Sequence, residues 1–144
     1  MADPHWPDRD RFVLSKGHAA LALYALLALR GALSEAQLDS FCGDDSLLGV
    51  HPEAALTGVD FSTGSVGLGV AQTLFSSLVQ DYVTEHGWMK DRPKGRMISL
   101  IGDAEMDEGN IYEALLDGWK QDLRDCWWVV DYNRQSLDAV IREG

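Results

Sequence analysis

Two oxygen-bearing side chains each follow a short apolar segment of this chain. Asp103 comes just after the segment at 97–101, and Asn133 comes just after the segment at 126–130. The stretch between them has a helical pattern, which predicts a strand, a crossover helix and a parallel strand. Because ligands of such sheets bind beyond the carboxyl ends of the strands, we expect both side chains at one ligand-binding edge.

A carboxylate and an amide oxygen in this arrangement suit a small hard cation, especially one shared with a diphosphate. Backbone carbonyls, water and phosphate oxygens would supply the remaining ligands. One Asp and one Asn make a poor all-protein magnesium site, so an acidic metal-binding protein without such an anion is the weaker interpretation. An ordinary strand, turn and helix with a surface aspartate at Asp103 is the other alternative.

Two histidines are the next candidates for chemistry. His18 lies at the start of an apolar run at 19–29, which predicts a helix. Ser15 is its expected N-cap and Gly31 its expected C-cap. The dipole and the free N–H groups at a helix start favour an anion, although a histidine there is more often structural. Since the run is apolar on nearly every face, we expect its helix to be buried within a larger body.

The second histidine, His51, lies in a loop-like region at 43–58 in which Gly, Asp, Ser and Pro are distributed. On these residues alone it is a surface-loop histidine that precedes a proline. The next segment, 63–69, is rich in glycine, but it follows no obvious strand and carries no P-loop lysine. It therefore matches neither a dinucleotide fingerprint nor a P-loop. Its glycines would instead let the backbone approach a flat ligand closely.

The remaining pattern completes an α/β fold with a partial doubly wound parallel sheet flanked by helices. Adjacent Trp127 and Trp128 would point to opposite faces of a strand, so both faces of the sheet should be covered. Ser34 and Gln37 have the spacing of a capping box at the start of a short helix. The other expected elements are an extended lead-in at 1–11, the end of the short helix near Cys42, a helix at 70–86 ended by Gly87, and a turn at 91–95.

Composition bounds the class of protein. The 144 residues suit one domain or part of one, and 46% apolar residues are enough for a sizeable core. A net charge of −11 without clustered basic residues argues against a nucleic-acid partner. The N-terminus lacks a signal-peptide pattern and the run at 14–29 falls short of a membrane span, so we expect a cytoplasmic protein. Cys42 and Cys126 have no metal-binding spacing and are expected to be buried, reduced thiols.

The residues around Asp103 and Asn133 resemble the signature of thiamine-diphosphate enzymes. Gly102-Asp103, with Asn133 thirty positions after Asp103, is similar to the family's Gly-Asp-Gly followed by Asn after about thirty residues. In that family the Asp and Asn side chains hold magnesium together with the carbonyl two residues past the Asn. The resemblance thus implies Asp103, Asn133 and Gln135 as metal ligands. It implies as cofactor-binding residues Gly102, Asp103, Ala104, Glu105 and Asn133.

Ala104 departs from the signature, because most relatives have glycine at this position. Alanine still presents its N–H to a phosphate, but it disfavours a left-handed backbone. We interpret Ala104 as tolerated variation and not as loss of the site. Among the acidic residues that follow, Asp107 is expected to be a favourable helix-dipole partner. Glu108 and Glu113 match acidic positions that in transketolases link two active sites and face the partner protomer, which implies a catalytic role for Glu108.

Three upstream segments resemble the same family. The segment at 10–18 is similar to a transketolase segment ending Ser-Asn-Gly-His, whose histidine approaches the diphosphate, which implies a catalytic and cofactor-binding His18. The segment at 49–53 resembles the Gly-His-Pro-Glu loop, which implies that His51 contacts substrate hydroxyls. The segment at 63–69 resembles the form found in homodimeric pyruvate dehydrogenases more than the transketolase form. It implies contacts to the aminopyrimidine and thiazolium rings from Gly64, Ser65 and Val66.

Two parent activities are compatible with these resemblances. The two histidines favour transketolase, which moves a two-carbon ketol unit between sugar phosphates. The segments at 102–108 and 133–138 are closer to the first component of pyruvate dehydrogenase, which acts on a 2-oxo acid. In both, the cofactor, thiamine diphosphate with Mg²⁺, carries the difficult chemistry. A non-catalytic module that keeps the fold and acts as a partner is the third interpretation.

The resemblance also defines what the 144 residues lack. In this family a catalytic Glu comes from a pyrimidine-binding domain, and a Ser-Gly-His-Pro-Gly segment precedes the part that resembles Met1 onward. We therefore expect 1–144 to be a partial N-terminal, diphosphate-binding domain without the pyrimidine-binding and C-terminal domains. Such a fragment, or piece of a split enzyme, should bind cofactor weakly and be inactive alone. Its expected partners are a sugar-phosphate or 2-oxo acid substrate and a second copy or separate pyrimidine-domain chain, without a nucleic acid or membrane.

Overall fold

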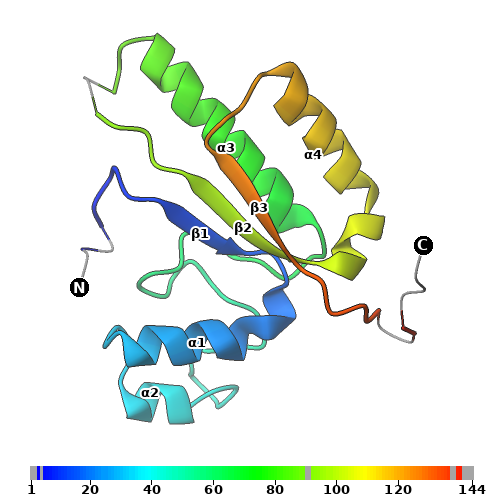
Figure 1. The fold of residues 1–144 in the computed structure, drawn as a ribbon. Helices are drawn as coiled ribbons and strands as arrows, with labels where there is room; N and C mark the ends of the chain where they lie inside the picture. Colours follow the sequence, from blue (N-terminus) through cyan, green and yellow to red (C-terminus); the bar gives the residue numbers. More distant parts are fainter. Residues whose placement is uncertain (1–2, 4, 90–91, 137–138, 141–144) are drawn as a thin grey trace.

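Three parallel strands form the sheet of this protein. The computed structural model describes residues 3, 5–89, 92–136 and 139–140. Strands β1 (Arg11–Leu14), β2 (Met97–Gly102) and β3 (Cys126–Asp131) lie in the order β1-β2-β3. Arg11 is opposite Met97, and Met97 is opposite Cys126. The carboxyl ends of all three strands therefore meet at one edge (Figure 1).

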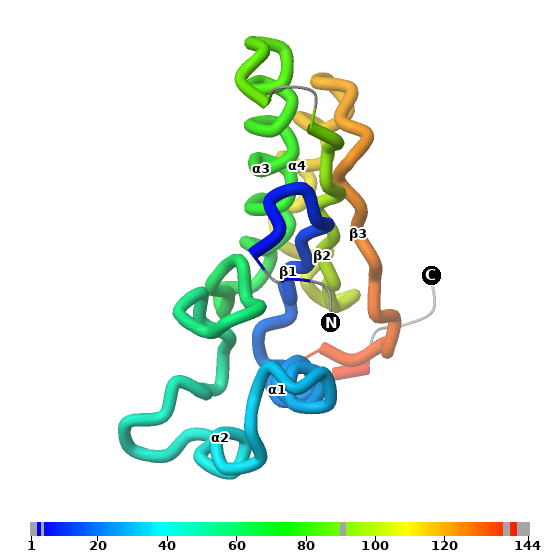
Figure 2. Tube along the Cα trace, turned by 90° about the vertical axis from the view of Figure 1, so that its left-hand side faces the viewer, coloured from blue at the N-terminus to red at the C-terminus, as the bar shows by residue number. Residues whose placement is uncertain are grey.

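Four α-helices lie in two groups around this sheet. Helices α3 (Leu68–Glu85) and α4 (Gly109–Lys120) cover one face, and Figure 1 shows them behind the strands. Helices α1 (Ala20–Leu29) and α2 (Glu35–Asp39) lie beyond the carboxyl ends of the strands, as Figure 2 also shows. The 3-10 helices η1 (Gly17–Ala19) and η2 (Asp103–Asp107) follow the ends of β1 and β2.

Each group of helices has its own apolar core. The core between β2, α3 and α4 consists of Val70, Leu74, Ile101, Ile111 and Ala114. The core around α1 consists of Ala20, Tyr24, Leu27, Leu33, Leu48 and Leu56. The first core fixes α3 on the sheet, and the second holds the long loops that precede α3. The carboxyl edge of the sheet lies between them.

The α/β class and the parallel pair expected from the sequence are confirmed, and α3 agrees with the helix expected at 70–86. The capping box is also confirmed, since the Gln37 N–H donates to the Ser34 hydroxyl oxygen at 3.2 Å. Gly31 follows the last helical turn of α1 with a left-handed φ of 74°, as a glycine at this position should. Strand β1 was not expected, because a strand of four residues carries almost no periodicity of its own.

Three local expectations are wrong. Ser15 does not cap α1, because η1 intervenes and the Ser15 hydroxyl donates to Glu105 instead. The short helix α2 ends at Asp39, before Cys42. Cys42 is exposed, whereas Cys126 is half-buried and its burial raises the pKa of the thiol. Both thiols are free, as expected.

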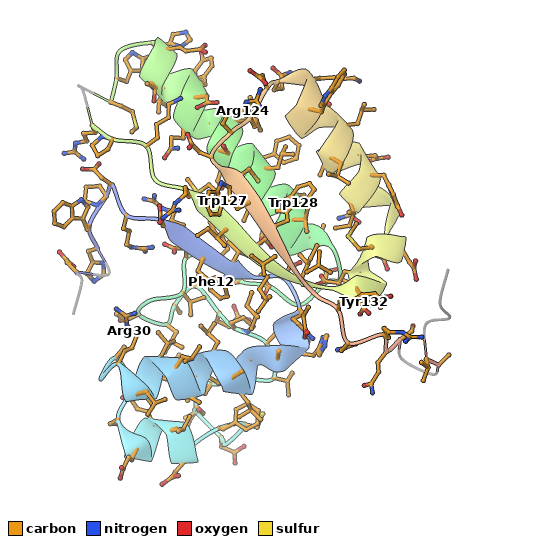
Figure 3. The ribbon with its side chains drawn as sticks, in the orientation of Figure 1. Phe12, Arg30, Arg124, Trp127, Trp128 and Tyr132 are labelled. Atoms are coloured by element: carbon orange, nitrogen blue, oxygen red, sulfur yellow. The ribbon has the colours of Figure 1, made fainter. Side chains whose placement is uncertain are left out.

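The coverage of both sheet faces expected from the sequence is not found among the residues that the structure describes. Trp127 and Trp128 are neighbours on β3 (Figure 3). The Trp128 indole N–H donates to Thr73 of α3 at 3.3 Å, whereas Trp127 on the opposite face is 49% exposed. Helix α1 is likewise not buried all round, since Leu21, Leu26 and Leu29 are exposed. The described part of the chain therefore leaves an open apolar sheet face.

Parts of three expected segments lie outside the described part of the chain. These are 1–2 and 4 of the lead-in, 91 of the turn, and 137–138 of the segment after β3. Among the described residues, the helices are all too short or too polar to cross a membrane.

Replacing Ile101 by alanine should destabilise the fold strongly. Its side chain is fully buried between β2, α3 and α4, so the truncation should lower the free energy of unfolding by about 3 kcal/mol. Leu29→Ala removes the same kind of group from an 85% exposed position and should change it by less than about 0.5 kcal/mol. Urea unfolding measures both, and equal losses would contradict the described core.

Candidate functional site

A pocket of about 520 Å³ opens where the three strands end. Four segments line it: the one after β1, the glycine-rich one before α3, the one after β2 and the one after β3. The residues that line the pocket are Ser15, Lys16, Gly17, His18, Gly64, Val66, Gly102, Asp103, Ala104, Glu105, Glu108, Asn133, Gln135 and Ser136. A hollow of about 530 Å³ beside α3 is lined by Arg11 and otherwise by uncharged side chains. The polar pocket is therefore the candidate site.

Asp103 joins the segments that follow β2 and β3. Its carboxylate is buried, with Oδ1 accepting from the Ala104 N–H at 3.0 Å and Oδ2 accepting from the Arg134 N–H at 2.6 Å. Asn133 Oδ1 accepts from the Gln135 N–H at 2.9 Å. Each of these oxygens has a second lone pair, so the hydrogen bonds orient the side chains without using their whole capacity as ligands.

This donor set fits a hard cation only when an anion completes the coordination. It consists of a carboxylate oxygen and an amide oxygen, which are among the ligands that Mg²⁺ accepts. The described residues contain no cluster of three or more His, Cys, Asp or Glu side chains able to hold a metal. A magnesium ion here would therefore share its coordination with water and phosphate oxygens, as expected from the sequence.

A buried ammonium group lies in the same pocket. Lys16 Nζ donates to Asp131 Oδ2 at 2.6 Å, and the Lys16 side chain is only 10% exposed. This ion pair connects the end of β1 with the end of β3. Sequence patterns did not single out Lys16, although it lies in the same segment as His18. His18 is in η1 and lines the pocket, where it was expected.

His51 lies beside the pocket and does not line it. A Cβ on Gly17 would lie 3.1 Å from the His51 ring, and a Cβ on Gly64 would lie 3.2 Å from it, so both glycines permit a close approach. The Tyr24 hydroxyl donates to the carbonyls of Gly49 and His51 at 3.0 Å and fixes this loop. Burial of this side chain is the main reason why the pKa of Tyr24 is raised.

The glycine-rich segment contributes two of its three expected residues to the pocket. Gly64 and Val66 line it, whereas the exposed Ser65 does not. The Thr63 hydroxyl donates to the carbonyl of Leu14 at 2.7 Å, which attaches this segment to the end of β1. The pocket therefore brings together most of the expected site residues from distant parts of the chain.

Two acidic residues behave differently from each other at the start of α4. Glu108 lines the pocket and precedes the first turn of α4, and it is exposed. Asp107 is exposed at the end of η2 and lies outside the first turn of α4, so its expected role as a dipole partner is wrong. Glu105 is buried and is held by protein donors.

Comparison with known proteins places the pocket in a family context. The family model described as "Transketolase, thiamine diphosphate binding domain" matches residues 1–143. A 6-deoxy-6-sulfo-D-fructose transketolase subunit from a Clostridium species is 36% identical, over 98% of this chain and 50% of the relative. An apulose-4-phosphate transketolase subunit from Phocaeicola vulgatus is 31% identical, over 96% of this chain and 48% of the relative. The chain thus spans about half the length of these curated relatives.

The fold is similar to that of solved transketolases. The transketolase from Campylobacter jejuni superposes with a TM-score of 0.89 at 31% identity, and the match covers 96% of this chain and 22% of that one. A mutant transketolase from Pichia stipitis superposes with a TM-score of 0.87 at 29% identity, covering 98% of this chain and 22% of that one.

Removing the carboxylate that faces Lys16 should destabilise the protein more than removing one from an exposed ion pair. Asp131→Asn takes away the anionic partner of a nearly buried ammonium, and we expect a loss of about 1–2 kcal/mol in the free energy of unfolding. Asp122→Asn is the matched control, because the ion pair of Asp122 with Arg124 is exposed on both sides. Its loss should be below about 1 kcal/mol. Equal losses of both variants in chemical denaturation would contradict a stabilising role for the pair that Asp131 forms with the nearly buried Lys16.

Proposed function

Because the chain belongs to the transketolase family, by its thiamine diphosphate-binding domain, we propose that it binds the diphosphate of this cofactor together with Mg²⁺. The observation that carries the proposal is the pair of oxygen-bearing side chains at two adjacent strand ends. Asp103 and Asn133 lie in one pocket and are fixed by backbone N–H groups. In our proposal they ligate the metal together with the carbonyl of Gln135, and the diphosphate supplies further oxygens.

The same pocket offers groups for the diphosphate itself. We assign Lys16 and His18 to it, because both line the pocket next to the proposed metal ligands. Gly102 and Ala104 line the pocket at the end of β2, although their backbone N–H groups already donate to Glu105 Oε2 and Asp103 Oδ1. On the other side of the pocket, Gly64 and Val66 are the proposed neighbours of the cofactor rings, with Ser65 at the rim. When bound, thiamine diphosphate supplies the carbanion stabilisation that the transfer of a ketol unit requires.

Transfer of a two-carbon ketol unit between sugar phosphates is the reaction we propose for the complete enzyme. The transketolase names of the relatives support it over the alternative, the decarboxylation of a 2-oxo acid. His18 is the histidine best placed for a role at the cofactor. His51 stays a prediction as a substrate contact, since its ring packs on Gly17 and Gly64 beside the pocket.

A second chain is part of the proposal. Two relatives are named subunits, which supports an enzyme assembled from separate chains. Helix α4 supports it as well, because four apolar side chains at helical spacing are exposed: Tyr112, Leu115, Leu116 and Trp119. Glu108 and Glu113 are exposed on the same helix or just before it. We propose that this surface meets the chain that carries the pyrimidine-binding domain and that Glu108 acts there.

Calorimetric titration with thiamine diphosphate, with and without Mg²⁺, tests the proposed metal site. The wild-type chain should bind in the presence of Mg²⁺, and Asp103→Ala and Asn133→Ala should weaken this binding at least about tenfold, which corresponds to 1.4 kcal/mol. Asp107→Asn is the matched control, since it removes an exposed carboxylate of the same short helix that does not line the pocket. It should bind like the wild type.

Absence of binding by a folded wild type, or binding that Mg²⁺ leaves unchanged, would contradict the proposal. A separate experiment addresses catalysis by mixing the chain with a pyrimidine-domain chain. Turnover of a ketose phosphate and an aldose phosphate in the mixture is the expected result. Stoichiometric binding without turnover would instead favour the non-catalytic module.

A further inference from the structure

The carboxylate of Glu105 is held by donors from three different segments. Its side chain is 3% exposed. Oε1 accepts from the Ser15 hydroxyl at 2.8 Å and from the Gly67 N–H at 2.9 Å, and Oε2 accepts from the Gly102 N–H at 2.7 Å. These donors belong to the segment after β1, the start of α3 and the end of β2. Glu105 thus connects segments that are up to 90 residues apart in the sequence.

The packing around these donors is too tight for larger side chains. A Cβ on Gly69 would lie 2.7 Å from Ser15, and a Cβ on Gly67 would lie 2.8 Å from the side chain of Asn110. Gly67 also has a left-handed φ of 80°, which glycine adopts without strain. Ser15 is 1% exposed and lies against the first turn of α3. The segments that meet at Glu105 are therefore in close contact with one another, and the side chains between them are shielded from solvent.

A carboxylate suits this junction better than its amide counterpart. All three partners of Glu105 donate, and two of them are backbone N–H groups that cannot reverse their polarity. A glutamine could turn its oxygen toward only one of these N–H groups, and its own NH₂ would then face the other. The negative charge also lies at the N-terminus of α3, where the helix dipole favours it.

We propose that Glu105 is a positioning residue that fixes the glycine loop (64–67) relative to the metal loop (102–104). Both of its oxygens accept hydrogen bonds from the segments that carry these loops, so we assign it to holding the loops together. A ligand that does not reach the glycine loop does not need this connection. A ligand that spans both loops does, and for thiamine diphosphate this consequence rests on the function proposed above.

Two variants and one control test this role in the full chain. Glu105→Gln removes the acceptor for one backbone N–H, and Ser15→Ala removes one donor without altering the acid. Gln80→Leu is the control, because buried Gln80 makes two hydrogen bonds with the backbone of Gly95, near the opposite end of the same helix α3. It should destabilise the fold without affecting the pocket.

The first measurement is amide hydrogen exchange without any ligand. Glu105→Gln should accelerate exchange at whichever of the Gly67 and Gly102 amides faces the new NH₂ group, and the control should leave both amides unchanged. The second is the affinity for thiamine diphosphate and for inorganic pyrophosphate, each with Mg²⁺. Glu105→Gln should weaken thiamine diphosphate about tenfold, the effect expected for one lost buried hydrogen bond, and pyrophosphate by less than about twofold. Ser15→Ala should act in the same direction with a smaller effect.

The outcomes separate this proposal from the proposed function. A wild type that binds neither ligand overturns the proposed function, while the exchange measurement still decides the role of Glu105. Unchanged exchange at Gly67 and Gly102 in both variants would falsify the positioning role. Equal weakening of both ligands would also overturn it, because Glu105 would then support the fold in general and not the distance between the two loops.

Discussion

The site depends on the hydrogen bonds that hold three parallel strand ends and a helix start together. Where a strand ends, its backbone N–H groups lose their sheet partners and need acceptors. Asp103 and Glu105 supply them: the first accepts from the segment after β3, and the second accepts from the start of α3 and from the end of β2. Hydrogen bonds to ionised groups are stronger than neutral ones. Two residues of η2 therefore set the relative positions of the loops that line the pocket.

This arrangement is also compatible with our proposal that a chain with a net charge of −11 binds a diphosphate in this pocket. The two buried acids near the pocket face backbone N–H groups, so their charge is compensated locally. Lys16 adds an ammonium that Asp131 holds in place. Charges on the distant surface have less influence on a ligand in the pocket, since at physiological ionic strength exposed charges are screened beyond about 8 Å. Local polarity, and not net charge, decides what the pocket binds.

The sequence was sufficient for the parallel pair and for the side chains that follow it, because two short apolar segments around a helical stretch determine where strand ends lie. Asp103 and Asn133 could be placed for this reason. Lys16 could not, since its partner Asp131 is 115 positions away and only the register of three strands brings them together. Strand β1 was missed because a four-residue strand carries almost no periodicity of its own. The inward orientation of Glu105 follows from the 3-10 geometry of η2, which no residue pattern indicated.

Two wrong expectations about burial concern surfaces, and they share a physical cause. Apolar residues all round α1 and on both faces of β3 predicted full burial, yet Leu29 and Trp127 are exposed in this chain. The residue pattern of a segment reflects every surface that packs against that segment in the functional protein, including the surfaces of other chains. The open sheet face and the exposed apolar side chains of α4 therefore support a protein-binding surface in the same way as the pocket supports a ligand site. In our proposal, the polar groups at the strand ends bind a ligand, and the exposed apolar groups bind a protein surface. An enzyme that assembles its active site between chains needs both, because each chain must keep its share of the site ordered before the other arrives.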